Sequence, residues 1–392
     1  MKQKYITTGA YYVAFILLGM TIAAEGTTLL KLAEHTSSAI DQISWVFFFG
    51  ALGYLIGSYT SGRLYDRLPG HQLMSSMLVL MGVVIIFVPL ASSLPVLIGI
   101  LIVLGFAKGA LDVGCNALLL WLHNERVAPF MNGLHAFFGV GTFLGPLINE
   151  RVLSTTGDIH WTYWIFSILA VPIAILIWRL PSPQARAVPD AHKNSALPIL
   201  PVAIMVACFI LYVGAEVSYG NWIYAYAVKL GLYTEVTANF LTSTFWGFFT
   251  VGRLISIWIS TRLRPITILY MDFVGCILSM GLILLFRDSA MVLRLGSSLL
   301  GISFASVFPT FITLAEERIH VTGTITGWFL VGGSLGGMII PVLIGQVFDR
   351  FGPGTMISIV LSAIVLNLGA LILFTKVSAR TQTTGDKIPV EI

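Results

Sequence analysis

Charged side chains are scarce in this sequence. Asp, Glu, Lys and Arg together make up only 10% of its 392 residues, whereas soluble domains carry about 25%. Hydrophobic residues reach 57% and the mean hydropathy is +0.90. A soluble globule cannot withdraw that much apolar surface from water. The composition therefore excludes a soluble globular protein and indicates a chain that crosses a membrane several times.

Cysteines and the common motifs of enzyme sites are also few or missing. The three cysteines, Cys115, Cys208 and Cys276, all lie in apolar runs, which argues against a disulfide framework. We find no metal-ligand cluster, no Gly-rich phosphate loop between a strand and a helix, and no segment long enough for a soluble module. The net charge of +4 comes without any basic block. We therefore expect no enzyme, no metal, no cofactor and no nucleic-acid partner.

Twelve apolar runs are each long enough to cross a bilayer as a helix, which takes about 17–25 residues. They cover roughly residues 8–30, 43–62, 72–91, 95–121, 131–152, 161–179, 198–226, 237–260, 266–286, 290–314, 322–346 and 355–375. The first run continues into a polar loop without a small-residue cleavage site, so we interpret it as an uncleaved span. The pattern predicts an all-α membrane protein with twelve transmembrane helices.

Lys and Arg are distributed unevenly between the two sides of these spans. With the N-terminus in the cytoplasm, fourteen of the 22 fall in cytoplasmic segments, five fall outside and three lie within spans. Basic loops stay in the cytoplasm, and an even number of spans returns the chain to its starting side. We therefore expect a multi-pass protein of the inner (plasma) membrane with both termini cytoplasmic.

The chain also carries an internal repeat. A shift of 195 residues places Gly19 on Gly214, Gly57 on Gly252, Arg67 on Arg262, Gly141 on Gly336 and Pro146 on Pro341. The longest polar loop, residues 181–197, separates six spans from six. We expect two pseudo-symmetric six-helix bundles, 1–180 and 198–376, joined by a cytoplasmic linker at 181–197 and followed by a cytoplasmic tail at 377–392. Duplicated halves of this kind are typical of carriers that bind substrate between them.

The loop after the second span reads GRLYDRLPG over residues 62–70. It resembles the G-x-x-x-D-R-x-x-G signature of the major facilitator superfamily. We expect Gly62 to let two helices approach, and Asp66 to lie at the start of the next helix or to pair with a neighbouring Arg. Arg67 would hold the cytoplasmic face. The second half has Thr261 in place of the acid, so a latch built from these residues is asymmetric.

Ionisable residues within the spans are candidates for function, because a bare charge there costs about 2.5–3.5 kcal/mol on insertion scales. They and their polar or aromatic neighbours are Glu25 in the first span, Lys108, Asp112 and Asn116 in the fourth, His135 in the fifth, Glu216, Tyr219, Asn221 and Trp222 in the seventh, and Trp246 and Arg253 in the eighth.

Lys108, Asp112 and Asn116 are spaced four residues apart and share one helix face. One interpretation is a buried ion pair between Lys108 and Asp112 that only neutralises itself. The other is that Asp112 takes up and releases a proton as the protein opens to each side, with burial and the nearby Lys tuning its affinity. Glu25 either lies solvated near an outer helix end or contributes to the same proton chemistry.

The seventh span, YVGAEVSYGNWIYAY over residues 212–226, is dense in aromatic rings. Aromatic faces stack on the apolar faces of sugars, while Glu216, Asn221 and the indole N–H groups bond hydroxyls. The same rings also suit a belt at the membrane interface. Taken alone, His135 fits a buried core position at which its ring nitrogens have hydrogen-bond partners.

At this point four segments together resemble the fucose–proton symporter family of the major facilitator superfamily, to which the animal sodium-dependent glucose transporter-like proteins are similar. The segments are ALDVGCN around Asp112, MNGLHAFFGVGTFLGPL (131–147), YVGAEVSYGNW around Glu216, and ASVFPTFITLAEERI (305–319) around Phe308 and Pro309. The resemblance runs through both halves. His135 stands where fucose-type members carry Gln.

The resemblance implies sugar uptake driven by a proton or sodium gradient. It implies that Asp112 carries the proton, that Glu25 matches the additional acid of fucose-type members, and that Asn116, His135, Glu216 and Phe308 face the substrate. Lys108, four residues from Asp112, would serve as its charge partner or replace the coupling ion in a uniporter.

We therefore expect a secondary active transporter for a monosaccharide of the hexose or deoxyhexose class, coupled to protons or sodium ions, acting as a monomer in the bilayer. The alternative is a proton-coupled antiporter that expels drugs or other small molecules, for which the abundance of Met and Phe leaves room.

Overall fold

The computed structural model describes residues 2–183, 199–319 and 321–385, and within these ranges its regular secondary structure is helical. Twelve of its helical segments are long and apolar enough to cross a membrane, which confirms the predicted number of spans. Each agrees with a predicted run, with ends that extend further in most cases. The first span, for example, covers Gln3–His35 where we predicted 8–30.

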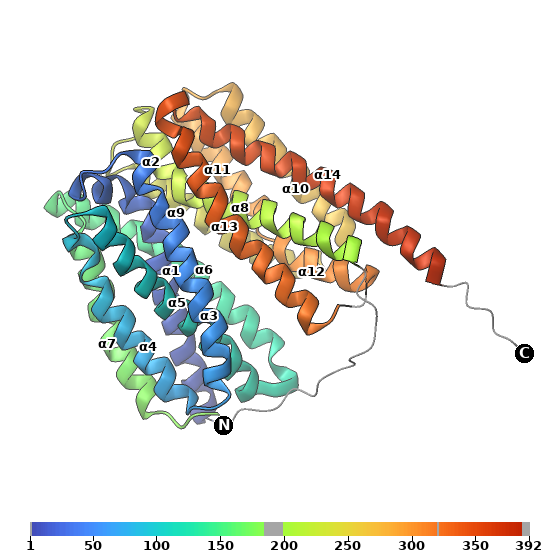
Figure 1. The fold of residues 1–392 in the computed structure, drawn as a ribbon, viewed down its shortest axis with the longest axis horizontal. Coiled ribbons are helices and arrows are strands. Elements are labelled where there is room, and N and C mark those ends of the chain that lie inside the picture. Colours follow the sequence, from blue (N-terminus) through green and yellow to red (C-terminus); the bar gives the residue numbers. More distant parts are fainter. Residues whose placement is uncertain (1, 184–198, 320, 386–392) are drawn as a thin grey trace, which may run out of the picture.

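The first half contains seven α-helices, of which the short α2 and α3 form one span (Figure 1). Their bounds are α1 Lys2–His35, α2 Ile40–Ile43, α3 Trp45–Tyr65, α4 Gly70–Ile85, α5 Leu94–His123, α6 Ala128–Thr156 and α7 His160–Arg179.

The second half likewise contains seven helices, and here α11 and α12 form one span. Their bounds are α8 Ile199–Lys229, α9 Ala238–Ile259, α10 Pro265–Leu285, α11 Ala290–Phe304, α12 Val307–Arg318, α13 Gly323–Phe351 and α14 Gly354–Gly385. The predicted linker lies outside the described residues from 184 onward, and α14 continues through the first part of the predicted tail.

The two halves repeat the same helix pairing. In the first half α1 packs on α6, α3 on α5 and α4 on α7, and in the second half α8 packs on α13, α9 on α11 and α10 on α14. The matched glycines lie at matched crossings: Gly19 faces the backbone of α6 near Gly141, and Gly214 faces that of α13 near Gly336. The predicted pair of pseudo-symmetric bundles is therefore confirmed, because the repeat preserves the positions at which helix backbones touch.

The tenth span is broken at its middle, where α11 ends at Phe304 and α12 begins at Val307. Pro309 has no amide hydrogen to offer to the carbonyl of Ala305, four residues earlier. The missing bond accounts for the interruption. Pro146 and Pro341 lie inside α6 and α13, which both continue past them.

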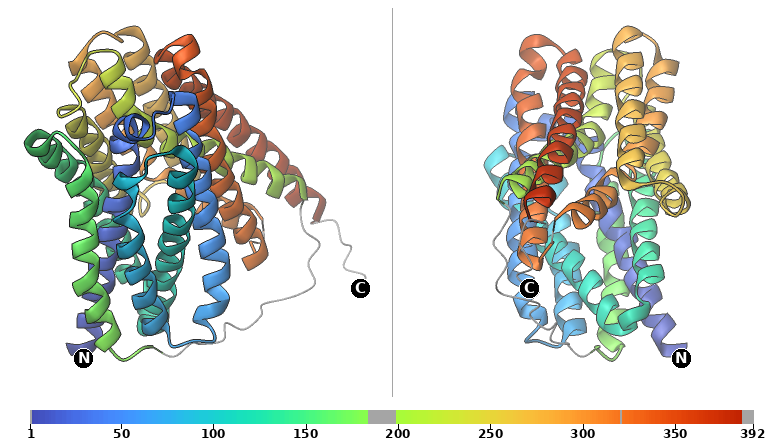
Figure 2. Two further views of the ribbon diagram at one scale, coloured as in Figure 1. Left: turned by 60° about the vertical axis from the view of Figure 1, so that its left-hand side comes forward. Right: turned by 90° about the vertical axis from the view of Figure 1, so that its right-hand side faces the viewer.

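The halves touch at one end of the molecule and diverge at the other (Figures 1 and 2). The diverging end carries the N-terminus and the turns that join α3 to α4, α5 to α6 and α9 to α10. We call it the open end, and the opposite end, which holds α2 and the turn between α8 and α9, the closed end.

The glycine crossings generate a prediction about stability. A Cβ at Gly141 would press against the Ile16 carbonyl, and one at Gly336 against the Ile210 carbonyl. Gly141→Leu and Gly336→Leu are therefore expected to lower the melting temperature of the purified protein, since overpacking costs about 1–3 kcal/mol. Gly99→Leu is the matched control, because no atom lies near that position. Unchanged melting of both crossing variants would contradict the close approach.

Candidate functional site

A cavity of about 660 Å³ lies between the two halves. From the first half it is lined by Phe15, Tyr54, Asp112, Asn132, His135 and Phe138. From the second half the lining includes Arg253, Ser306, Phe308, Pro309, Thr310 and Thr313. The wall thus combines aromatic rings, hydroxyl groups and ionisable side chains, which is the composition expected of a site for a small polar molecule.

The cavity extends toward the open end. Ser260, Leu263 and Pro265, in and beside the turn between α9 and α10, belong to its wall. Its deep part is formed by residues near the middle of their helices, such as Phe15 and Asp112. The structure therefore represents a state in which a central site is accessible from one side only.

Asp112 is held in the wall of the cavity by two neutral donors. The Tyr54 hydroxyl donates to Oδ2, and Asn116 Nδ2 donates to Oδ1 at 2.9 Å. Asp112 forms no ion pair with any lysine, arginine or histidine that the structure describes. The predicted face shared by Asp112 and Asn116 is confirmed, and the acid on it carries an uncompensated charge when ionised.

Glycines bring Tyr54 to this acid. Where α3 crosses α5, Gly105 faces the backbone of Gly50 and Tyr54, and Gly109 faces the Tyr54 carbonyl. A larger residue at either glycine would separate the helices and draw the phenol away from Asp112. The close crossing is thus a condition for the hydrogen bond.

The predicted ion pair between Lys108 and Asp112 is wrong. Lys108 Nζ pairs instead with Glu25 Oε1 across the contact between α1 and α5. The Lys108 side chain is only 4% exposed and that of Glu25 22%, so the interpretation of Glu25 as a solvated helix-end residue is wrong as well. A buried ammonium needs a counter-charge, and the carboxylate on the facing helix supplies it.

His135 and Arg253 face the cavity from opposite halves. The His135 ring meets the edge of Phe15 at 5.8 Å between centroids. The Arg253 guanidinium lies over the Phe249 ring, 4.6 Å from its centroid, and its buried Nε has no partner in the described residues. No ion pair joins Arg253 to Glu216 in the described residues. Phe308 lines the cavity as predicted.

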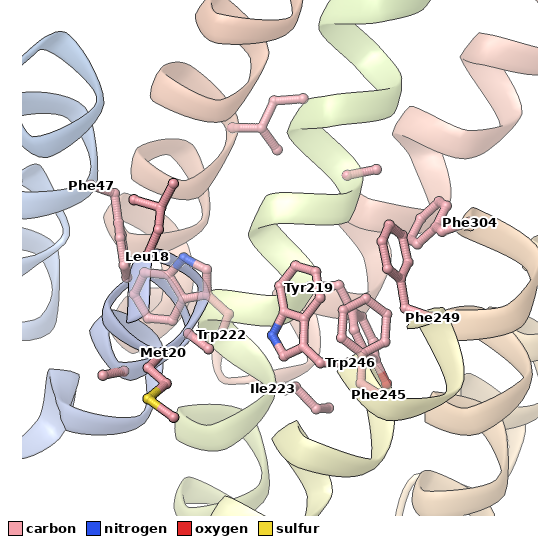
Figure 3. Close-up of a cluster of buried hydrophobic side chains, with 14 of the residues drawn as sticks. Leu18, Met20, Phe47, Tyr219, Trp222, Ile223, Phe245, Trp246, Phe249 and Phe304 are labelled. Atoms are coloured by element: carbon pink, nitrogen blue, oxygen red, sulfur yellow. The ribbon is translucent and has the colours of Figure 1, made fainter. Parts of the chain in front are cut away.

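Six residues predicted to bind substrate do not line the cavity in this state: Asn116, Glu216, Trp246, Tyr219, Asn221 and Trp222, of which the last three are packed as follows. Trp222 is fully buried and packs on Phe47 (Figure 3). It also packs on Phe348, and its indole N–H donates to the Pro341 carbonyl at 3.0 Å. The Tyr219 hydroxyl bonds Ser297 Oγ at 2.7 Å. Asn221 presents its backbone to Gly26 of α1. None of the three lines the cavity.

Trp246 packs between Phe245 and Phe249 (Figure 3). It lies about two helical turns before Arg253 on α9. It is 6% exposed, and its indole N–H has no hydrogen-bond partner in the part of the chain that is described. A buried donor without a partner costs free energy. The indole packs against Gly220 of α8, and Trp246 does not line the cavity.

The closed end is held by direct contacts between the halves. Asn149 Nδ2 donates to Asn239 Oδ1 at 2.9 Å, and Gln346 Nε2 donates to the Asp41 carbonyl at 2.8 Å. Lys31 lies 3.5 Å from Glu235 in an ion pair across the same seam. A Cβ at Gly26 would collide with the backbone of Asn221, so α1 and α8 touch directly.

A loop acid at the closed end has an altered proton affinity. Burial raises the pKa of Asp158, but the Ile159 N–H and the neighbouring His35 and His160 stabilise the carboxylate more, so the net shift of its pKa is downward. Both imidazoles lie 3.2 Å from Asp158 Oδ1. The cluster joins α1 to the turn before α7 and lies away from the cavity.

The predicted latch is not assembled in this state. Asp66 caps the C-terminal end of α3 rather than starting the next helix, and Arg67 is exposed. Gly62 faces open space, so its predicted role in close helix approach is wrong here. These residues lie at the open end, where the halves have moved apart. Their role as a latch stays a prediction for a state closed at that end.

Two residues of the site did not stand out in the sequence. Tyr54 is one aromatic residue among many, and only the crossing of α3 and α5 assigns it to Asp112. Asp272 in α10 accepts a hydrogen bond from Ser306 Oγ, a cavity residue, at 2.6 Å. The same signal that selected Asp112, an acid within an apolar run, applies to Asp272.

Comparison with known families matches residues 10–341 to the Major Facilitator Superfamily. The "Sodium-dependent glucose transporter 1A" of Mus musculus is 28% identical over 376 residues, covering 85% of this chain and 88% of the relative. The "Major facilitator superfamily domain-containing protein 4A" of Homo sapiens is 25% identical over 453 residues, covering 90% and 88%.

Solved structures of similar fold include the nucleoside transporter NupG, with a TM-score of 0.74 and 14% identity over 96% of this chain and 99% of that one. Another is a bacterial homologue of the human lysosomal transporter Spinster, with a TM-score of 0.70 and 13% identity over 96% and 97%. The family match spans most of the chain and agrees with the twelve spans and the duplicated halves. The chain therefore belongs to the major facilitator superfamily, a family of membrane carriers and not of enzymes.

Proposed function

We propose that this carrier moves a monosaccharide of the hexose or deoxyhexose class by alternating access, in symport with a coupling cation. The single observation that carries the proposal is Asp112, an acid in the wall of a cavity between two halves that forms no ion pair with the described residues. The glucose transporters among the relatives support the substrate class.

The lining of the cavity suits a sugar. Phe15, Phe138 and Phe308 offer apolar ring faces, against which the C–H face of a pyranose packs. Asn132 and Thr310 offer donors and acceptors for hydroxyl groups. Sugar bound there would also approach the unpartnered indole N–H of Trp246 if the halves closed around it.

Asp112 provides the coupling in this proposal. An ionised carboxylate without a counter-ion is costly to seal away from water. When a proton binds, the group becomes neutral, and the halves can close over the cavity and reopen at the other end. Tyr54 and Asn116 orient the carboxyl for that exchange. The Lys108–Glu25 pair is already neutral as a unit and does not line the cavity, so it has no part in the coupling step.

The coupling ion and the orientation are part of the proposal. We propose that both termini are cytoplasmic in the plasma membrane, so that the open end faces the cytoplasm, and that the carrier is a monomer. A proton bound to Asp112 is one coupling ion, and the sodium dependence named for the relatives supports Na⁺ as another.

Uptake into proteoliposomes tests the function. Radiolabelled hexoses and deoxyhexoses are expected to accumulate when an inward gradient of H⁺ or Na⁺ is imposed, each applied alone. Hydrophobic cations serve as the comparison, because the alternative antiporter would move those outward in exchange for protons. Movement of the cations without sugar accumulation would reject the proposal.

A substitution separates coupling from movement of the sugar. Asp112→Asn keeps the shape of the side chain and resembles its protonated, neutral form, but it cannot release a proton. It is expected to reduce accumulation to simple equilibration, while exchange of internal for external sugar continues near the wild-type rate. Asp288→Asn, at an exposed acid, is the control and should behave as wild type. A variant at position 112 that still concentrates sugar would show that the proton role is wrong.

Alternation itself depends on the contact between α1 and α8. In Gly26→Trp the indole would hold the closed end apart, because even a Cβ there meets Asn221 Cα at 2.6 Å. We expect uptake to be lost while sugar-induced thermal stabilisation remains. A cysteine replacing Ser44, which is fully buried at the closed end, should react faster with an impermeant thiol reagent in the Gly26→Trp background than in the wild-type background.

Gly9→Trp on the same helix is the matched control, since nothing lies near that position. Normal uptake by Gly26→Trp would be incompatible with closure of the halves at this contact.

A further inference from the structure

We propose that the second half contains a sodium site, formed by Asp272 of α10 and the break between α11 and α12. The proposal rests on cation-coupled transport as proposed above and assigns a second cation-binding group in addition to Asp112. It concerns residues that the account of the cavity leaves without a role.

Asp272 is a second acid of the membrane interior without a cationic partner. Its Oδ2 accepts one hydrogen bond, from Ser306 Oγ at 2.6 Å, and it forms no ion pair within the described ranges. Its side chain lies between exposed and fully buried. A charge so placed needs a positive partner, and the described residues form no ion pair with it.

The broken span brings further oxygen atoms to this acid. Because Pro309 cannot donate to the Ala305 carbonyl, that oxygen loses its usual helical partner. Ala305 is fully buried and directly precedes Ser306, the residue bonded to Asp272. The Asp272 carboxylate and the Ser306 hydroxyl therefore meet next to a residue whose carbonyl lacks its usual helical partner.

Ser303 adds an independent observation. It is 6% exposed, and no hydrogen bond from its hydroxyl is found in the described structure. A Cβ at Gly275 of α10 would run into the Ser303 hydroxyl, so this oxygen faces the helix that carries Asp272. Ser303 lies about one turn before Ser306, and Gly275 lies about one turn after Asp272 on the facing helix. The buried hydroxyl thus lies on the same contact as the acid, the one between α10 and the span formed by α11 and α12.

This set of groups suits a hard monovalent cation. Carboxylate, hydroxyl and carbonyl oxygens are the ligands that such ions prefer over nitrogen or sulfur. The C-terminal end of α11 carries the negative pole of the helix, which adds to the attraction. Carriers with interrupted helices use the freed carbonyls at such breaks to hold sodium.

The position of the site allows it to act on transport. Ser306 lines the cavity, and so does Ile268, one turn before Asp272. Phe308 and Pro309 of the same break form part of the cavity wall. An ion at Asp272 would therefore fix the conformation of α12 and with it the surface that faces the substrate.

Thermal unfolding of the purified full-length protein tests the site without requiring transport. Sodium chloride is titrated against choline chloride at constant ionic strength, at pH 6 and at pH 8. A bound ion stabilises the native state in proportion to its occupancy. The wild type is expected to melt at a higher temperature with sodium at both pH values, and potassium should not replace it.

The variants define the ligands. Asp272→Asn should abolish the sodium response, and Ser306→Ala should weaken the apparent sodium affinity about tenfold. Asp288→Asn, the same change at an exposed acid, should keep the full response. Asp112→Asn should also keep it, because Asp112 lies on α5 in the other half.

The outcomes separate the two proposals. A sodium response that survives in Asp272→Asn, or a wild type that responds to pH but not to sodium, would overturn the site. If Asp272→Asn fails to fold, an unchanged sodium affinity in Ser306→Ala would overturn it instead. Absence of sugar accumulation under every gradient would reject the proposed function and leave the sodium titration intact as a test of the site.

Discussion

The structure depends on the cost of placing charge where water is excluded. Every ionisable side chain inside the bundle must find a partner or border water. Lys108 and Glu25 solve the problem by pairing across α1 and α5. In the part of the chain that the structure describes, Asp112 and Asp272 form no ion pair, and the hydrogen bonds that they accept come from neutral groups. The unpaired acids are therefore the places where a cation from outside the chain has the most to contribute.

Close helix crossings set these partnerships. The hydrophobic effect does not drive one membrane helix against another, because the surrounding lipid is as apolar as the helix surface. Small residues that allow direct backbone contact therefore provide the packing. Glycines on α3 and α5 bring the Tyr54 phenol to Asp112, and Gly26 brings α1 against α8 at the closed end. The same type of contact thus builds the permanent interior of each half and the temporary seam between them. Within a half these crossings carry hydrogen bonds such as Tyr54–Asp112, and between the halves they are joined by bonds such as Asn149–Asn239.

Sequence reasoning succeeded where a signal is local. The number of spans and the duplication follow from the order of apolar runs and matched residues along the chain. The shared face of Asp112 and Asn116 follows from their spacing on one helix. It failed for Lys108, which was assigned to the neighbour on its own helix and in fact pairs with an acid 83 residues away. It also placed Tyr219 and Trp222 at the cavity, although both are packed into the core in this state. Aromatic density in a span does not reveal which side of the helix faces the other half.

By itself the sequence determined the class of the protein. Hydrophobic runs of membrane length, a repeat of 195 residues and a few acids in apolar surroundings are properties of the chain that no packing arrangement can remove. Only the tertiary structure decided which acid is neutralised, which is left for a cation, and which end of the molecule is closed. Those outcomes depend on contacts between helices distant in sequence, because a difference of a few ångströms at a crossing determines whether two polar groups meet.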